Sequence, residues 1–442
     1  MTQTDRSPMP KAGVRRVAVV GAGYVGLPTA AVLSHHGHMV TLAERDERRL
    51  EVLREGRSPI VEHGLEEMLK DGMSTGRLRT VRSAAEAVVG AEFVFLCVET
   101  PQSADGSADL SYITAAASEI APHLADGAII VNKSTVPVGT VGLVERVLGR
   151  ADVVVVSNPE FLREGTAVAD SLNPDRIVVG ADDREAAARV AELFSDSGAP
   201  AVITDATTSE LIKYASNAFL ATKLTFINTM AGLCEAVGAD VLDLVLGVGY
   251  DKRIGFEFLR PGPGWGGSCL PKDTAALVAI SNAAGYDVSI VRGAISGNEE
   301  QMRRVVAKIA TAVGGSVRDR TIGVLGLSFK ANTGDRRDSP ALSITRMLVA
   351  AGASIRAFDP TVSTEDADQP DLTHLTVFDS AYEAVTGTHA IALLTEWQEF
   401  RWLDYSKIRG LVANPAIVDA RNLLESGLVH RLGFSYSGIG RS

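Results

Sequence analysis

Short apolar runs alternate with helix-like segments through the first part of the chain. After residue 13 the sequence reads VRRVAVV, GAGYVG, LPTAAVLSHHG and HMVTLAE, which predicts a strand, a glycine turn, a helix and a second strand. Further apolar runs occupy residues 91–98, 127–134, 152–158 and 175–180. Strands that alternate with helices predict a parallel sheet with helices on both faces.

The pattern changes near Thr207, because residues 207–247 show helical spacing and little β signal. A segment rich in glycine and proline, RPGPGWGGSCLPKD, interrupts the helical pattern, and strands return at residue 321. We therefore predict an α/β fold with two Rossmann-like, doubly wound parallel-sheet domains joined by a central helical region. The predicted parts are a flexible tail at 1–13, an N-terminal domain at 14–206, a helical region at 207–316 and a C-terminal domain at 317–442.

The composition, 46% hydrophobic and 22% charged in 442 residues, is typical of a folded globular protein. The formal net charge of −11 has the wrong sign for covering nucleic acid or an anionic membrane, so neither partner is expected. No apolar run approaches the roughly 18 residues of a membrane span, and residues 1–13 lack the apolar stretch of a signal peptide. The odd number of cysteines, three, argues against a disulfide framework and predicts a reducing, cytoplasmic setting.

The first glycine turn carries a dinucleotide-binding pattern. Gly21, Gly23 and Gly26 follow a strand and begin a helix, where backbone amides can approach a pyrophosphate. Glu44, at the end of the next strand, suits a ribose 2′-hydroxyl and repels a 2′-phosphate, which favours NAD over NADP. The adjacent Arg45 weakens that preference, and a glycine-rich turn without a nucleotide is the alternative.

Cys269 lies in a setting that favours reactivity. It follows Gly266, Gly267 and Ser268, and Lys272 and Asp273 come soon after it, so the thiol could be exposed beside a cation. On residue types alone, a nucleophile and a structural thiol remain equally open. Cys97, in an apolar strand, and Cys234, on a helix face, are expected to be buried fillers.

Other charged pairs have both functional and ordinary interpretations. Glu160 and Glu164 in NPEFLREG lie four residues apart, either as a carboxylate pair in a cleft or as a helix surface. Lys213 and Asn217 share one helix face and could stabilise an oxyanion, although a solvated face is the favoured interpretation on this spacing alone. The eight histidines show no metal-binding spacing, so no metal site is expected.

Near the second predicted glycine turn, the loop after GVLGLSF carries Lys330, Arg336 and Arg337. These cations suit a ligand's phosphates, although the segment lacks the three-glycine spacing of a usual dinucleotide site. On the charge pattern alone, a solvated basic loop is the better interpretation.

Together these segments resemble the nucleotide-sugar 6-dehydrogenases, and most closely the branch that acts on UDP-glucose. The resemblance covers nearly the whole chain after the tail. It is carried by GAGYVGLPTA, SPIVEHGL, STVPVGT, NPEFLREG, PDRIVVG, ELIKYASNAFLATK, DKRIGFEFLRPGPGWGGSCLPKD and GLSFKANTGDRRDSP.

The resemblance implies an NAD-dependent, four-electron oxidation of UDP-glucose at C6 to UDP-glucuronate. Cys269 would form a thiohemiacetal and then a thioester. Lys213 and Asn217 would stabilise the C6 oxyanion, while Asp273, Glu164 and Thr135 would hold or activate water.

The resemblance also assigns the binding residues. The implied cofactor-binding residues are Gly21, Gly23, Tyr24, Val25, Gly26, Glu44, Arg45, Thr100, Pro101, Thr135, Glu164 and Lys272. The implied substrate-binding residues are Glu160, Phe161, Leu162, Lys213, Asn217, Arg253, Phe258, Leu259, Gly262, Gly266, Cys269, Phe329, Lys330 and Arg421. The C-terminal domain would bind the nucleotide sugar. A homodimer built on the central helices is implied, with Arg253 reaching the neighbouring site.

Some positions depart from the family, and other functions stay open. Glu44 stands where the family usually has Asp, and Thr229 replaces a common Glu. Alternative substrates are dTDP-glucose, a UDP-N-acetylhexosamine and GDP-mannose, since uracil and thymine differ by one methyl group. An alternative of another class is a catalytically silent NAD- or nucleotide-sugar-binding regulator, against which Cys269 and Lys213 argue.

Overall fold

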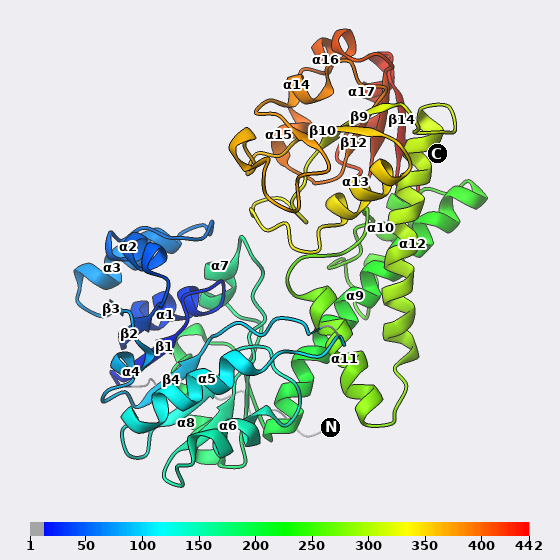
Figure 1. The fold of residues 1–442 in the computed structure, drawn as a ribbon. Coiled ribbons are helices and arrows are strands. Elements are labelled where there is room, and N and C mark those ends of the chain that lie inside the picture. Colours follow the sequence, from blue (N-terminus) through cyan, green and yellow to red (C-terminus); the bar gives the residue numbers. More distant parts are fainter. Residues whose placement is uncertain (1–12, 104, 442) are drawn as a thin grey trace. The chain divides into compact units, whose positions relative to one another are not determined.

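A computed structural model describes residues 13–103 and 105–441 (Figure 1). Residues 1–12 of the predicted tail therefore lie outside the described residues. The chain divides into two compact units, and each is described separately. The first unit runs to Ser216 and includes Ala275–Gly285, and the second comprises Asn217–Thr274 and Tyr286–Ser442.

The first unit is built on an eight-stranded sheet with the strand order β3-β2-β1-β4-β5-β6-β7-β8. The strands are β1 (Arg16–Val20), β2 (Met39–Ala43), β3 (Leu78–Val81), β4 (Phe93–Leu96), β5 (Ile129–Asn132), β6 (Val154–Ser157), β7 (Ile177–Gly180) and β8 (Ala201–Thr204). Its helices are α1 (Gly26–His35), α2 (Glu47–Arg54), α3 (Leu65–Ser74), α4 (Ala84–Ala87), α5 (Ser111–Ile120), α6 (Thr140–Leu148), α7 (Ala167–Leu172) and α8 (Arg184–Glu192).

Both faces of this sheet are covered. In β1, Val17 and Val19 belong to one buried cluster, whereas Ala18 and Val20 belong to another. Because successive side chains of a strand point to opposite faces, this alternation places a hydrophobic core on each side of the sheet. The predicted doubly wound architecture is confirmed for this unit.

One junction in the sheet differs from the predicted all-parallel pairing. β6 and β7 pair antiparallel, through Ser157 and Gly180, while β7 and β8 are parallel to each other. The connection from β6 to β7 contains only the short helix α7 after an irregular loop. Alternation of apolar runs indicates that strands exist, but it does not indicate whether a strand pairs parallel or antiparallel with its neighbour.

The helical middle of the chain is also confirmed. It contains α9 (Ala206–Val237), α10 (Val241–Gly249), α11 (Leu270–Ala283) and α12 (Ser289–Ala312). Helix α9 has 32 residues, and the boundary between the two units falls within it, after Ser216.

The second unit has a six-stranded parallel sheet with the order β11-β10-β9-β12-β13-β14. Its strands are β9 (Thr321–Leu325), β10 (Ser354–Phe358), β11 (Thr376–Val377), β12 (Ala390–Leu393), β13 (Ala416–Asp419) and β14 (Ser435–Gly438). Its remaining helices are α13 (Pro340–Ala350), α14 (Ala381–Val385), α15 (Gln398–Arg401), α16 (Tyr405–Leu411) and α17 (Ser426–Arg431). The second predicted Rossmann-like sheet is therefore present.

Among residues 13–103 and 105–441, no helix combines the length and the apolar character that crossing a bilayer requires.

The first glycine turn depends on close backbone approach. Gly21 has φ +99°, and a Cβ added at Gly26 would lie 1.8 Å from the Gly21 carbonyl oxygen. A Cβ at Gly23, in contrast, would meet no atom within 4 Å. Gly26 is thus required by packing of α1 against β1, whereas Gly23 leaves open space above the turn.

We predict that Gly26→Ala lowers the free energy of unfolding by about 1–3 kcal/mol, because the added methyl group forces the turn apart. Gly23→Ala should change it by less than about 1 kcal/mol, because the methyl group enters open space. Urea unfolding of both variants checks this, and equal losses would contradict the packing role assigned to Gly26.

Candidate active site

The acidic residue at the end of β2 is tied to its own loop. Glu44 is 8% exposed and accepts a hydrogen bond from the Asp46 amide through Oε1, at 2.9 Å. Its second oxygen lies 3.5 Å from Arg49 Nε, and Arg49 also donates to the Ala22 carbonyl at 2.6 Å. Glu44 is therefore held beside the glycine turn, while Arg45 is exposed and lies 5.5 Å from the centroid of the Tyr112 ring.

These residues fit a dinucleotide. The first turn of α1 carries no acidic side chain, so no carboxylate there neutralises the positive end of the helix. The open space at Gly23 lies at the same place. A pyrophosphate can approach the backbone there, with the Glu44 carboxylate at the neighbouring strand end.

Two further loops at the carboxyl ends of strands are joined to each other. The Thr100 hydroxyl after β4 donates to the Thr135 carbonyl oxygen after β5, at 2.9 Å. The Ser134 hydroxyl donates to the Val98 carbonyl oxygen at 2.6 Å. The structure thus brings together two residues assigned to the cofactor, Thr100 and Thr135, while Pro101 is exposed next to them.

A buried ion pair joins α9 to the loop after β6. Lys213 Nζ donates to Glu160 Oε1 at 2.8 Å, and the two side chains are only 4% and 6% exposed. Glu160 Oε2 accepts from the Leu162 amide at 2.6 Å. Burial by itself would raise the pKa of Glu160, but the charge and hydrogen bond of Lys213 and the Leu162 amide together hold it below its ordinary value.

Phe161, one residue after Glu160, packs between two cations. Its ring centroid lies 5.4 Å from Lys213 Nζ and 3.6 Å from Arg176 Cζ. Lys213 therefore does not lie on the solvated helix face that one interpretation of its spacing allowed.

The loop at residues 158–165 is held at both ends by side chains that the sequence analysis did not single out. At its start, Lys133 Nζ donates to Asn158 Oδ1 at 3.1 Å, and Lys133 is 8% exposed. At its end, Glu62 Oε2 accepts from the Gly165 amide at 2.8 Å. Burial raises the pKa of Glu62 and lowers that of Lys133. In the sequence, Lys133 and Glu62 are each a single charged residue at the end of an apolar stretch, which is only a weak indication of a role in the site.

In the second unit, Cys269 directly precedes α11. It is the one half-buried cysteine of the three, while Cys97 and Cys234 are buried as expected. The Ser268 hydroxyl lies 3.5 Å from its sulfur. A residue at the start of a helix lies at the positive end of the helix dipole, where negative charge is stabilised.

Asp273 links two other predicted residues. Its Oδ2 accepts from Asn217 Nδ2 at 2.6 Å, and its Oδ1 accepts from Lys272 Nζ at 2.7 Å. Asp273 is 1% exposed, and its amide donates to the Cys269 carbonyl oxygen at 2.9 Å. The structure therefore brings Asn217, Lys272 and Asp273 to the first turn of the helix that Cys269 precedes.

The loop before Cys269 is packed closely against its own unit. A Cβ at Gly266 would lie 2.0 Å from the Asp338 carbonyl oxygen, and one at Gly267 would lie 2.8 Å from the Phe329 ring. Asn298 accepts from the Trp265 amide at 2.8 Å and donates to the Trp265 carbonyl at 2.9 Å. These contacts hold the loop in one conformation, and a side chain added at Gly266 or Gly267 would disrupt it.

Several substrate-assigned residues lie around this loop. Arg421 donates to the carbonyl oxygens of Phe329, at 2.7 Å, and Leu394, at 3.0 Å. A Cβ at Gly262 would lie 3.4 Å from Arg421, and Lys330 Nζ lies 5.5 Å from the Phe329 ring centroid.

The remaining substrate-assigned residues lie in the segment before the glycine-rich loop. Leu259 is buried, and Phe258 has the unusual φ of +61°. Arg253 is 89% exposed in its side chain and donates to Asp251.

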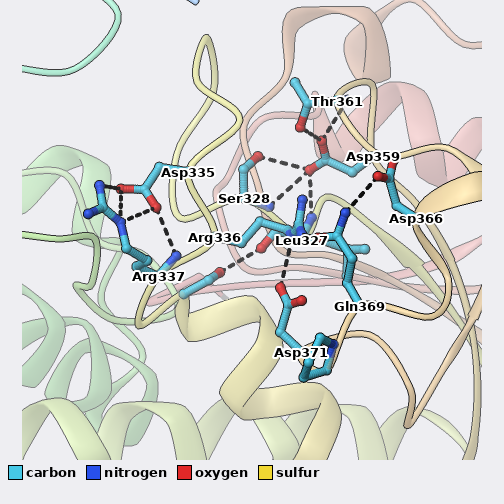
Figure 2. Close-up of polar contacts among 12 residues, drawn as sticks. Leu327, Ser328, Asp335, Arg336, Arg337, Asp359, Thr361, Asp366, Gln369 and Asp371 are labelled. Carbon is cyan, nitrogen blue, oxygen red and sulfur yellow. Dashed lines mark hydrogen bonds and ion pairs between the residues drawn. The ribbon is translucent and has the colours of Figure 1, made fainter. Parts of the chain in front are cut away.

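The basic loop after β9 is engaged by acids of its own unit. Arg336 Nε donates to Asp371 at 2.8 Å, and Arg337 donates to Asp335 at 2.7 Å, as Figure 2 shows. Asp359, which follows β10, accepts from the amides of Leu327 and Ser328 at 2.7 and 3.0 Å. Asp359, at the end of β10, therefore bonds the backbone of the turn after β9. This agrees with the lack of the three-glycine spacing of a usual dinucleotide site in this segment.

Among the described residues, no group of histidine, cysteine and acidic side chains is arranged to hold a metal ion.

Models of the UDP-glucose/GDP-mannose dehydrogenase family match three parts of the chain. They are its NAD binding domain at residues 15–197, its central domain at 207–300 and its UDP binding domain at 323–426. A UDP-glucose 6-dehydrogenase of Rhizobium meliloti is 44% identical over 436 residues, covering 96% of this chain and 99% of the relative. The UDP-glucose 6-dehydrogenase TuaD of Bacillus subtilis is 42% identical and covers 97% of this chain and 94% of its own length.

Solved structures agree with this similarity. A UDP-glucose dehydrogenase from Pyrobaculum islandicum aligns with a TM-score of 0.89 and 36% identity, covering 97% of this chain and 98% of its own. A UDP-D-ManNAc dehydrogenase from Pyrococcus horikoshii aligns with a TM-score of 0.86 and 28% identity, covering 96% and 99%.

We predict that Lys213→Met lowers the free energy of unfolding by about 3–5 kcal/mol near neutral pH, because it leaves a buried carboxylate without its cation. In the unchanged protein the lowered pKa of Glu160 adds stability that is lost as the pH falls through its folded value. In the variant, burial should raise that pKa, so stability is lost as the pH rises. Urea unfolding from about pH 2.5 to about pH 8 measures both slopes.

The double variant Lys213→Met with Glu160→Gln is the control, since it removes the buried charge. It should recover stability and abolish the reversed slope. If Lys213→Met alone keeps the original pH dependence, the ion pair does not set the ionisation of Glu160.

Proposed function

Because this chain belongs to the UDP-glucose/GDP-mannose dehydrogenase family, we propose that it oxidises UDP-glucose at C6 to UDP-glucuronate with two NAD per sugar. The observation that carries the proposal is the arrangement at Cys269. A half-buried thiol precedes a helix whose first turn holds the Asn217–Asp273–Lys272 cluster. A protein that only binds a nucleotide needs no such thiol.

In the first oxidation, the C6 hydroxyl gives its proton to bound water and C6 loses a hydride, so the alcohol becomes an aldehyde. NAD supplies the hydride-accepting chemistry in both oxidations. Lys213 and Asn217, one turn apart on α9, stabilise the negative charge on the C6 oxygen. An amide nitrogen carries two N–H bonds, so the bond from Asn217 to Asp273 leaves it a second donor.

In the second oxidation, the Cys269 thiolate bonds to the aldehyde carbon and forms a thiohemiacetal. Loss of a second hydride from C6 gives a thioester on Cys269. Water then adds to C6, the carbon–sulfur bond breaks, and the acid and the thiol are released. Asp273, Glu164 and Thr135 hold or activate this water, and Glu160 orients Lys213 through their 2.8 Å hydrogen bond.

We assign NAD binding to residues of the first unit and nucleotide-sugar binding to residues of the second. Gly21, Gly23 and Glu44 hold NAD, with Thr100 and Thr135 on the loops beside it. Phe258, Leu259, Gly262, Lys330 and Arg421 hold the nucleotide sugar in the second unit. A cytoplasmic location stays a prediction from the cysteine content.

We expect limiting UDP-glucose with excess NAD to give close to two NADH per sugar, because one nucleotide sugar passes through both oxidations. Absorbance of NADH followed to completion measures the yield. A yield near one would contradict the route through the thioester. No NADH would move the search to dTDP-glucose, UDP-N-acetylhexosamines and GDP-mannose, and failure with all of them would favour a silent binding protein.

Cys269→Ser is the matched control for that experiment. The hydroxyl keeps the size of the side chain but is a much weaker nucleophile than a thiolate. The variant should bind UDP-glucose and fail to complete the oxidation to the acid. If it still gives two NADH per sugar at the original rate, Cys269 is not the nucleophile.

We also propose a homodimer formed through α9. Phe219, Phe226, Leu233 and Val237 are 64%, 47%, 52% and 67% exposed and are spaced by seven, seven and four residues, which places them in one stripe. An exposed apolar stripe of this kind favours burial against a partner. The exposed guanidinium of Arg253 is available to reach the neighbouring copy.

We predict that the double variant Phe226→Glu and Leu233→Glu sediments as a monomer, because a dimer would bury four unpaired carboxylates. Val89→Glu, at a position 65% exposed in the first unit, should leave the dimer intact and serves as the control. A dimer that survives the double substitution would exclude this stripe as the interface.

A further inference from the structure

A second buried lysine lies near the catalytic ion pair, and the proposed mechanism does not use it. Lys133 follows directly after β5, and its side chain is buried with 8% of the residue exposed. Its Nζ donates to Asn158 Oδ1 at 3.1 Å and lies 5.3 Å from the centroid of the Phe194 ring. Burying an ammonium group is costly, so packing alone favours an apolar side chain at this place.

The partner of Lys133 is fixed from three sides. The Asn158 amide donates to the Asn132 carbonyl oxygen at 2.9 Å, and its side-chain Nδ2 donates to the Val178 carbonyl oxygen on β7 at 2.7 Å. With the bond from Lys133, Asn158 ties the end of β5, the end of β6 and β7 together. Asn158 is also the first residue of the loop that carries Glu160.

Only Pro159 separates Asn158 from Glu160. Proline fixes its own φ and restricts the residue before it, so the backbone between Asn158 and Glu160 has few conformations. Glu160 in turn accepts from Lys213 at 2.8 Å. A continuous path of contacts therefore runs from Lys133 through Asn158 to the Glu160–Lys213 pair, all within the first unit.

The charged and titratable groups that act on Lys133 are Glu160, Lys213 and Cys97. Burial raises the pKa of the Cys97 thiol to about 12, so this sulfur stays protonated and neutral. Burial lowers the pKa of Lys133. Glu160 accepts its hydrogen bond from Lys213, while Lys133 donates to Asn158.

We propose that Lys133 is a positioning residue for the reaction: through Asn158 it fixes the start of the 158–165 loop, so that Glu160 presents Lys213 to the C6 oxygen of the sugar. This inference rests on the proposed function, in which Lys213 stabilises that oxygen. Lys133 itself touches neither substrate nor cofactor in this role.

The first test compares Lys133→Met with His38→Met. His38 is 3% exposed, lies in the same unit, contacts Arg15 and Leu193, and has no part in the reaction. Both variants should lose stability, which urea unfolding measures. Only Lys133→Met should lower kcat, by about tenfold to a hundredfold, because Lys213 is displaced from the reacting oxygen. KM for NAD should stay unchanged in both.

A double variant, Lys133→Met with Asn158→Leu, separates positioning from packing. Replacing both partners of this bond by apolar side chains removes the Asn158 oxygen that Lys133→Met leaves unsatisfied, so part of the stability should recover. The recovery is partial because the Val178 carbonyl oxygen loses its bond from Asn158. On the proposed role kcat stays low, because the loop has lost its anchor. Recovery of kcat together with stability would overturn the proposal, and so would an unchanged kcat in folded Lys133→Met.

A measurement independent of turnover keeps this inference apart from the proposed function. Amide hydrogen exchange of residues 158–165 should be faster in Lys133→Met, or in the double variant if the single one does not fold, and unchanged in His38→Met. If the unchanged protein oxidises no nucleotide sugar, the proposed function fails and this exchange still decides whether Lys133 holds the loop. Unaltered exchange would overturn the positioning role.

Discussion

An ammonium group that leaves water loses its hydration, and Lys213 offsets this loss with the Glu160 carboxylate at 2.8 Å. The two partners come from α9 and from the loop after β6, so the ion pair ties a long helix to the end of the first sheet. Asn217 lies one turn further along the same helix and bonds Asp273 at 2.6 Å. One helix, α9, thus carries both groups assigned to the oxyanion, four residues apart in the sequence.

The position of the Cys269 thiol depends on close packing of the loop before it. The loop before Cys269 passes so close to Asp338 and Phe329 that Gly266 and Gly267 have no room for a side chain. Its backbone is bonded by Asn298 on α12, and the Gly262 amide donates to Asn228 on α9 at 2.8 Å. A reactive side chain on a loop is accurately placed only when the surrounding structure holds that loop, and here glycine packing does so.

The fold followed well from sequence where a local rule decides the structure. The glycine turn after β1, both α/β sheets and the helical region that begins near residue 207 follow from periodicity and from the steric properties of glycine. The antiparallel direction of β7 did not follow, because it rests on a single pairing of Ser157 with Gly180. The spacing of apolar residues does not indicate the direction in which a strand pairs.

The site was less predictable, since burial decides the role of a charge and spacing does not report burial. Lys133 and Glu62 resemble ordinary charges at the ends of apolar stretches, yet both are buried and hold the same loop. His38, three residues after the end of α1, is 3% exposed, and the spacing of the histidines gives no indication of its burial. Arg336 and Arg337 looked available for phosphates, but each bonds an aspartate of its own unit.

The uneven exposure of the three cysteines has a practical consequence. Cys97 and Cys234 are buried, and the raised pKa of Cys97 keeps its sulfur protonated, whereas Cys269 is half-buried at the start of a helix. Alkylating reagents react with accessible thiolates and spare buried thiols. The folded protein therefore offers one site for covalent labelling without any cysteine having to be removed, so a single fluorophore or mass tag would report directly from the centre where the chemistry is proposed to occur.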